Sequence, residues 1–197
     1  MILPFEPYTS LWKTQFASMQ AELMDRLKTL QPVIEHIGST AVEGLSAKPI
    51  IDIMIGVKGE EVLDLVPPCL EGQNYVYYEQ YNEEMPYRRF FVRLKEKPSC
   101  LGLPESVGVG EDIPERLNDH QMRLAHIHVL PVNSVHWIRH IAFRDYLRTH
   151  PEVKAAYQVL KEQLVLQQWK TGNDYNEGKD AFLKSEEKKA VNWYTNY

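Results

Sequence analysis

One short segment of the chain, His36–Ile55, holds residue types that could bind an anion. Gly38-Ser39-Thr40 follows an expected strand and precedes an expected helical turn, where backbone N–H groups and two hydroxyls can face a phosphate. Lys48 follows within the same crossover and adds a positive charge. Taken alone, a simple turn with a serine or threonine cap is the commoner explanation. With Lys48 close behind it, the segment predicts a phosphate site.

A lone carboxylate and two histidines add a second kind of chemistry. Asp52 lies inside the apolar run Ile50–Val57, where an ionised carboxylate is costly unless it is paired or bound to a metal ion. An arginine partner or a cap on the Gly38 turn is the structural alternative. His126 and His128 place two imidazoles on one face of a later strand, which suits a metal ion or acid–base catalysis. The candidate metal ligands are Asp52, His126 and His128, and the candidate catalytic residues are Asp52 and His128.

Strand parity groups these side chains, because successive residues of a strand point to opposite faces of a sheet. The strands concerned are expected at Ile50–Val57, Arg88–Lys95 and Arg123–Leu130. In each, an aliphatic side alternates with a side that carries polar or charged residues, and we expect the polar sides to share one face. A half-solvated sheet face is the alternative. Arginine and histidine in this number favour a phosphate or metal site. The predicted phosphate-binding residues are Gly38, Ser39, Thr40, Lys48, Arg89, Arg93 and, from the C-terminal helical segment, Lys179.

The expected helices and strands must position these residues. Apolar residues at spacings of three and four follow Thr9 and Ser10, which predicts a first helix. Further elements are expected as strands at Val33–Ile37 and Asn74–Glu79, and as helices over Glu60–Leu70, from Ser134 to His150, at Glu152–Trp169 and at Asp180–Trp193. Residues 97–121 read as a long loop, and we expect the Arg–Asp cluster of Phe143–Arg148 to brace helices. The fold class is α+β: a mixed, mainly antiparallel β-sheet with helices packed on one face and a C-terminal helical segment.

Length and composition restrict the class of protein. The 197 residues suit one domain, with a sheet-containing core at about 1–131 and C-terminal helices at about 132–197. The formal net charge of −5 argues against a general nucleic-acid or membrane-surface binder. Two cysteines, Cys69 and Cys100, lack CxxC spacing and favour a reduced, cytoplasmic protein. Neither a signal peptide nor a bilayer-spanning segment is expected.

The segment HIGSTAVEGLSAKPIIDIMIGV resembles the signature of the GrpB family. Other matching segments follow in order: Arg88-Arg89-Phe90-Phe91, His126-Ile127-His128-Val129, Phe143–Arg148, His150-Pro151 and Gly178-Lys179. The resemblance spans nearly the whole chain and implies a nucleotidyltransferase-like fold. That superfamily places a Gly-Ser turn before a strand with two acidic residues one apart, and a third acid on a later strand. Here Asp52 matches the first acid, but Met54 occupies the second acidic position and the later strand offers histidines.

The resemblance implies a nucleotide or another small phosphorylated molecule as ligand, with Mg²⁺ or Mn²⁺ as the expected metal. In the first hypothesis, nucleotidyl transfer, Asp52 carries a metal ion and His128 acts as base or ligand. A thioether at Met54 cannot replace a carboxylate for Mg²⁺, which motivates the second hypothesis, a binding module without catalysis. The third is a single-metal hydrolase or lyase that uses Asp52, His126 and His128. The sequence leaves the oligomeric state open, and it is compatible with a homo-oligomer.

Overall fold

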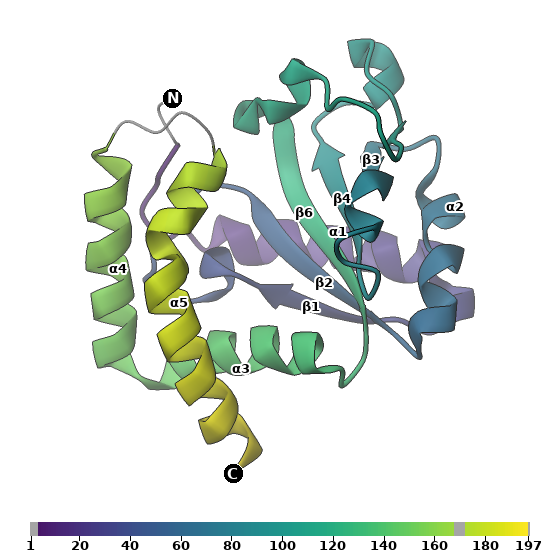
Figure 1. Cartoon of the computed structure of the whole chain (residues 1–197). Helices are drawn as coiled ribbons and strands as arrows, with labels where there is room; N and C mark the ends of the chain where they lie inside the picture. The colour runs from purple at the N-terminus through teal and green to yellow at the C-terminus, as the bar shows by residue number, and fades with distance from the viewer. Residues whose placement is uncertain (1–3, 168–171, 197) are drawn as a thin grey trace.

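A mixed β-sheet forms the centre of the molecule (Figure 1). The computed structural model describes residues 4–167 and 172–196, with the backbone alone for 172–176. Within these residues the sheet has six strands in the order β1-β2-β6-β4-β3-β5. The strands are β1 (Val33–Ile37), β2 (Ile51–Val57), β3 (Tyr75–Tyr78), β4 (Arg89–Leu94), β5 (Ser106–Val107) and β6 (Arg123–Pro131). The pairs β2–β6 and β3–β5 are parallel and the other three are antiparallel, so the sheet is mostly antiparallel as predicted.

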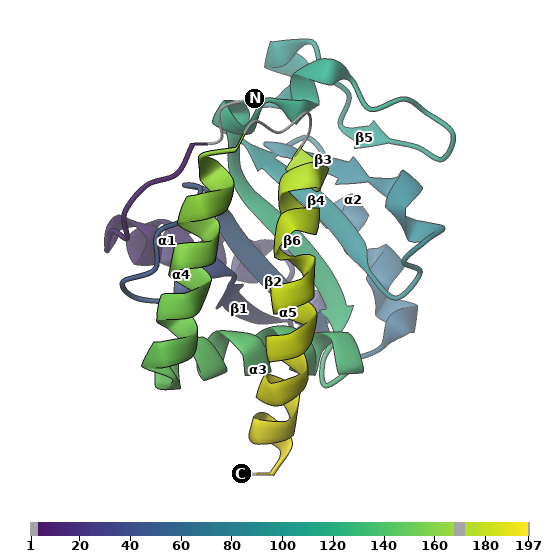
Figure 2. The same cartoon turned by 60° about the vertical axis from the view of Figure 1, so that its left-hand side comes forward.

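Helices cover both faces of this sheet, so the prediction of helices on one face is wrong. The helices are α1 (Leu11–Arg26), α2 (Pro67–Leu70), α3 (Val135–Thr149), α4 (Pro151–Val165) and α5 (Gly172–Thr195). In Figure 1, α1 passes behind the sheet, α4 and α5 stand at its left-hand side, and α3 crosses below. Figure 2 shows α4 and α5 side by side over the same face. Within the described residues, no helix is both long enough and apolar enough to cross a bilayer.

The aliphatic face of β2 packs against α1. Trp12, Met19 and Leu23 are buried on this helix and join the isoleucines of β2 in one cluster. They lie on one stripe, as the spacing of apolar residues predicts for an amphipathic helix. The helix begins after Thr9, whose Oγ1 accepts a hydrogen bond from the N–H of Leu11 at 3.3 Å.

The opposite face of β2 packs against α3, which is why this strand is apolar on both sides. Ser134 caps α3 as predicted, because its Oγ accepts a hydrogen bond from the N–H of Trp137 at 3.2 Å. Trp137 packs on Met54 and Leu130 of the sheet. It also lies over Gly56, where an added Cβ would come within 2.6 Å of the indole ring. The close contact between α3 and β2 therefore requires a glycine at this position.

Residues 97–121, predicted as a loop, contain short 3₁₀ turns and the strand β5, which pairs with β3. Leu103, Val107 and Leu117 are buried in a cluster with Val76 and Val92 of the sheet. The segment is therefore anchored to the sheet at these three residues, on the face that carries Asp52 and His126.

Candidate functional site

The Gly38 turn lies directly on the carboxylate of Asp52. Strands β1 and β2 are antiparallel neighbours with Ile37 opposite Asp52, so the chain turns over the carboxylate as it leaves β1. Gly38 has φ +69° and ψ −171°, a combination that is almost confined to glycine. A Cβ on Gly38 would lie 2.3 Å from Asp52 Oδ2. A glycine is therefore needed for this approach, and the predicted helical turn follows as a 3₁₀ turn at Ser39–Ala41.

Asp52, His126 and Arg123 form a chain of hydrogen bonds. Asp52 lies beside His126 because β2 and β6 are parallel neighbours. Asp52 Oδ1 is 3.2 Å from His126 Nδ1, and Arg123 Nη1 is 3.2 Å from His126 Nε2. A guanidinium can only donate, so Nε2 is the acceptor and the imidazole proton sits on Nδ1, facing Asp52. Burial acts to raise the pKa of Asp52, but the hydrogen bond from His126 and the charge of Lys179 hold that pKa below its ordinary value.

The Asp52 side chain keeps an exposed fraction of 31% although protein surrounds it. The ionised carboxylate of Asp52 therefore lies at the bottom of a recess that is open to solvent.

His128 lies two residues further along β6, opposite Phe90 of β4. Arg88 Nη1 is 3.4 Å from His128 Nδ1, and the ring of His140, from α3, lies 6.0 Å from the His128 ring. Burial, reinforced by the Arg88 charge, lowers the pKa of His128 well below its ordinary value. Burial, with the charge of Arg139, lowers the pKa of His140 to about 4. Both imidazoles are neutral at pH 7, so the positive charge of this face comes from lysine and arginine.

Three lysines bring positive charge to the recess. Lys48 Nζ is 3.5 Å from His120 Nδ1, at the end of the 97–121 segment. Lys161 of α4 is buried, with its Nζ 3.4 Å from Ser39 Oγ and a further hydrogen bond to a backbone carbonyl of the same loop. Burial, together with the charge of Lys179, lowers the pKa of Lys48 to about 8 and that of Lys161 to about 7. Burial lowers the pKa of Lys179 itself to about 8.

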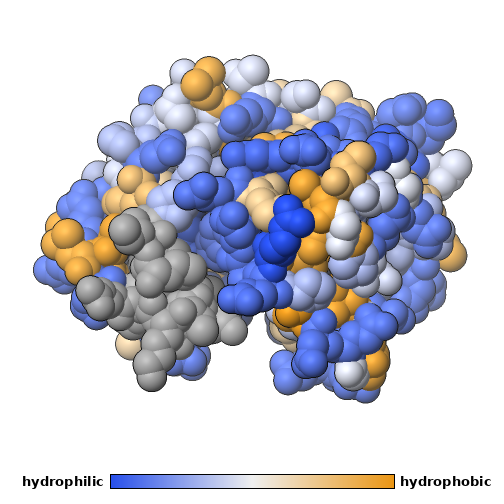
Figure 3. Space-filling view, turned by 90° about the horizontal axis from the view of Figure 1, so that it is seen from above, coloured by the Kyte–Doolittle hydropathy of each residue, from blue (hydrophilic) through white to orange (hydrophobic). Residues whose placement is uncertain are grey.

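These side chains come from elements far apart in the sequence. Strands β2 and β6 form the floor, α4 and α5 each supply a lysine, and the end of the 97–121 segment closes one side. Figure 3, seen from above, shows an indented outline with strongly hydrophilic residues beside the indentation. The arrangement can hold an anion above Asp52, with neutral histidines as hydrogen-bonding neighbours.

Arg89 and Arg93 lie on the other face of the sheet, so their predicted place in the phosphate site is wrong. In the β4–β6 pairing, Phe90 stands opposite His128, and the two arginines stand opposite aliphatic residues of β6. Parity separated the two sides of β4 correctly. It could not say which side of β4 shares a face with Asp52, and the charged side lies on the opposite face.

Both arginines find acidic partners on that opposite face. Arg89 Nε donates to Asp64 Oδ1 at 2.7 Å, and Arg93 Nη2 lies 2.7 Å from Glu22 Oε2 of α1. Arg93 also lies over the ring of Tyr75, at 5.4 Å from its centroid. Their charges are thus neutralised where the sheet packs against α1 and the segment before α2.

Thr40 also differs from its predicted role as a phosphate ligand. Its side chain is buried, and its Oγ1 is 2.9 Å from His36 Nε2. The ring of His36 stacks on Phe16 of α1 with centroids 4.6 Å apart. The Thr40 hydroxyl therefore supports the turn from the α1 side, while Ser39 contacts Lys161 on the recess side.

The donor set on this face does not fit Mg²⁺ or Mn²⁺. Met54, at the second acidic position, is fully buried against Trp137 and offers no oxygen. Asp52 already accepts from His126, whose other nitrogen accepts from Arg123. Among the residues that the structure describes, no three His, Cys, Asp or Glu side chains are placed to hold a metal ion. Hard divalent cations require several oxygen ligands, and Asp52 supplies the one carboxylate of the predicted set.

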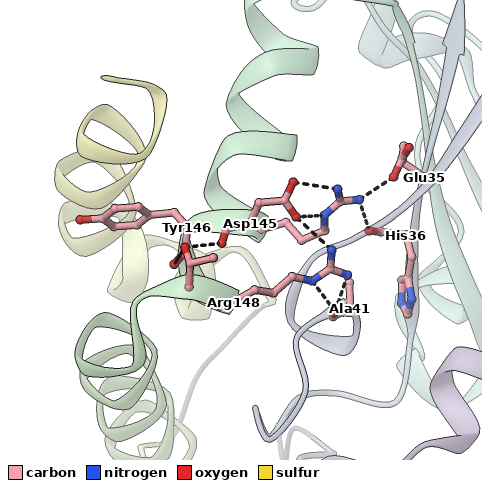
Figure 4. A network of polar contacts seen from close by, with 8 residues as sticks. Glu35, His36, Ala41, Asp145, Tyr146 and Arg148 are labelled. Atoms are coloured by element: carbon pink, nitrogen blue, oxygen red, sulfur yellow. Dashed lines mark hydrogen bonds and ion pairs between the residues drawn. The ribbon is translucent and has the colours of Figure 1, made fainter. Parts of the chain in front are cut away.

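An ion-pair network holds α3 against the Gly38 turn (Figure 4). Arg144 donates to Glu35 at 2.6 Å and to Asp145 at 2.8 Å. Arg148 donates to the carbonyl of Ala41 at 2.8 Å and to Asp145 at 2.9 Å. The cluster was predicted to brace helices, and its hydrogen bonds brace α3 against β1 and the turn.

Several residues of the recess were not predicted as site residues. They are Arg88, His120, Arg123, His140 and Lys161. Arg88, His120 and Arg123 lie at strand ends or in a loop, where no periodicity shows where a side chain points. His140 and Lys161 lie on α3 and α4, and whether they reach the recess depends on how these helices pack against the sheet.

Comparisons with known proteins agree with the resemblance of the sequence. A family model described as GrpB protein matches residues 4–189. The chain is 29% identical over 187 residues to UPF0157 protein YqkA of Bacillus subtilis. This alignment covers 93% of this chain and 47% of that protein. It is 33% identical over 183 residues to UPF0157 protein PA4798 of Pseudomonas aeruginosa, covering 92% and 64%. The chain thus spans about half of the first relative and just under two thirds of the second.

A solved structure gives the same result. The crystal structure of the conserved protein GrpB from Enterococcus faecalis superposes with a TM-score of 0.74 at 31% identity, and the match covers 96% of this chain and 98% of that one. The match over residues 4–189 settles the family. This chain belongs to the GrpB family.

Proposed function

We propose that this chain binds the phosphate group of a small phosphorylated molecule, nucleotides included, in the recess above Asp52. The observation that carries the proposal is the gathering of lysines beside the Gly38-Ser39 turn, where Lys161 Nζ lies 3.4 Å from Ser39 Oγ. The charge of Lys179 lowers the pKa of both Lys48 and Lys161, as expected for like charges held close together. Like charges held together at partial burial cost free energy, and a bound dianion would offset that cost. The carboxylate of Asp52 offsets part of the positive charge of these lysines.

Arg88 supports the same ligand class. Its Nε is buried and has no hydrogen-bond partner within the described residues, while its Nη1 faces His128. A guanidinium with an unused donor is suited to a phosphate oxygen, since charge-assisted pairs of this kind are strong. The Gly38-Ser39 turn beside Asp52 also agrees with the nucleotidyltransferase-like superfamily, an assignment that we retain as part of the proposal.

Binding is favoured over nucleotidyl transfer. The buried thioether of Met54 leaves Asp52 without a second carboxylate for a two-metal site. His128, predicted as a general base, is neutral at pH 7 and would hydrogen-bond the ligand; its catalytic role stays a prediction. The single-metal alternative would require His126 to give up one of its two hydrogen bonds.

Calorimetric titration tests the proposal with pyrophosphate, ATP, coenzyme A and glucose 6-phosphate, at low salt with EDTA present. We expect at least one of them to bind, and Lys48→Met and Lys179→Met each to weaken binding by about tenfold or more, since a hydrogen bond to a charged group contributes about 1.5–3 kcal/mol. Lys184→Met is the matched control, because Lys184 lies on the same helix, is exposed and pairs with Asp180. Its affinity should equal that of the wild type.

Three results would contradict the proposal. Binding of none of the four compounds would remove it, as would equal loss of affinity in Lys184→Met. An effect of Arg93→Gln as large as that of Lys179→Met would place the ligand on the wrong face of the sheet. Consumption of ATP with Mg²⁺ or Mn²⁺ present would instead support nucleotidyl transfer.

A further inference from the structure

A second cavity lies on the opposite face of the sheet from Asp52. Its volume is about 500 Å³, within the range of about 300–1,000 Å³ that is typical of small-molecule pockets. It opens where β3 and β4 meet α2 and the turn Glu79–Asn82. The proposed phosphate site does not include any of its walls.

The floor of this cavity is aromatic. Tyr75 and Phe91 are almost fully buried, and Tyr77 stacks on Phe91 with ring centroids 4.8 Å apart. Asn82 Nδ2 donates to the Tyr77 hydroxyl at 2.6 Å, which fixes the orientation of that ring. Tyr77 is partly exposed, so it presents an electron-rich ring to a ligand without any rearrangement.

The rim of the cavity is acidic. It carries the carboxylates of Asp64, Glu71, Glu79 and Glu105, and the described lining contains no lysine or arginine. Arg89, which does not line the cavity, forms an ion pair with Asp64 at 2.7 Å and so offsets the charge of that carboxylate. Glu105 is held in place by a hydrogen bond from the N–H of Gly72 at 3.0 Å, and Glu71 and Glu79 are exposed.

The chemistry of this lining favours a cation. Aromatic rings and carboxylates both attract a positively charged group that carries N–H or polarised C–H bonds.

We propose that this cavity binds a small organic cation, an alkylammonium compound whose charged group lies over Tyr77 between the carboxylates. Cations are attracted to the face of an aromatic ring, and sites for ammonium ligands combine such rings with acidic groups. The cavity and the recess above Asp52 therefore select ligands of opposite charge on opposite faces of one sheet. This second site does not depend on the phosphate proposal.

NMR titration of the ¹⁵N-labelled full chain with choline, putrescine and spermidine tests the proposal. We expect at least one of them to bind with a Kd of about 1 mM or tighter, with shift changes at residues 64–82, 91 and 105–106. 3,3-Dimethylbutan-1-ol, the uncharged carbon analogue of choline, should cause none. Tyr77→Leu should weaken binding about tenfold and Glu79→Gln several-fold. The exposed Glu83, which does not line the cavity, gives the matched control Glu83→Gln, with unchanged affinity.

Several outcomes would overturn the proposal. These are the absence of binding by all three ammonium compounds, equal binding of the neutral analogue, and shift changes confined to other surfaces. Glu79→Gln keeps the test valid if Tyr77→Leu fails to fold, because Glu79 is exposed and its loss leaves the core intact. Unchanged affinity in Glu79→Gln and Tyr77→Leu alike would place the cation elsewhere.

Discussion

Replacing Gly38 by alanine should destabilise the protein through two separable costs. The backbone at φ +69° and ψ −171° is almost confined to glycine, so alanine costs roughly 1–3 kcal/mol there. The new Cβ would also lie 2.3 Å from Asp52 Oδ2 and 3.0 Å from Asp52 Cβ. The carboxylate must then move away from His126, and hydrogen bonds to charged groups contribute about 1.5–3 kcal/mol. We expect a total loss of about 3–5 kcal/mol in the free energy of unfolding.

Urea denaturation in a double-mutant cycle separates the two costs. In the Asp52→Ala background the carboxylate is absent and only the 3.0 Å contact with the Cβ of residue 52 remains, so Gly38→Ala should cost about 2 kcal/mol, mostly the backbone part. Gly110→Ala is the matched control, because Gly110 has φ +77° and an added Cβ there meets nothing within 4 Å. It should show a backbone cost alone and no coupling to Asp52.

Two results would refute this reasoning. One is a cost of Gly38→Ala no larger than that of Gly110→Ala. The other is an equal cost with and without the Asp52 carboxylate, which would mean that the turn does not lie on Asp52 as the structure shows.

Three further predictions follow from the same contacts. Affinity for a phosphorylated ligand should fall as pH rises from about 7 to 9, because the recess lysines, with pKa values of about 7 and 8, lose their protons there; a flat calorimetric profile would contradict this. Burial lowers the pKa of His36 from 6.5 to about 4, so the unfolded chain takes up this proton first and His36 should contribute up to roughly 3 kcal/mol to the loss of stability between pH 6.5 and 4; His36→Phe should remove this share of the slope in urea titrations. Arg144→Lys should cost about 2 kcal/mol in thermal unfolding by losing paired contacts to Asp145, whereas the exposed Arg139→Lys should stay within about 0.5 kcal/mol.

Part of the site could be predicted from the sequence because neighbouring strands impose regular alternation. Asp52 and His126 share a face, since β2 and β6 are adjacent, parallel and in register. His128 follows by parity from His126. The cap of α3 was also predictable to within two residues, Asn133 or Ser134, because capping depends on local hydrogen bonds.

The remainder depends on tertiary pairing, which alternation does not encode. Arg93 lies on the apolar face because α1 brings Glu22 to meet it, and that contact joins residues 71 positions apart. Lys161 and Lys179 reach the recess only because α4 and α5 fold back over the sheet, as Figure 2 shows for the helices. Helices on both faces could not be predicted because the polar side of β2 suggested an open face, whereas Met54 on that side packs against α3.

The most direct test is an NMR titration of the lysine side chains, followed through their ¹³Cε shifts between pH 6 and 11 without ligand and again with pyrophosphate. If positive charge is held together above Asp52, Lys161 should titrate near pH 7, and Lys48 and Lys179 near pH 8, in the free protein. Pyrophosphate should move all three upward, because a bound anion stabilises the charged form. Titration of all three near pH 10.5, unaffected by pyrophosphate, would contradict an anion site in this recess.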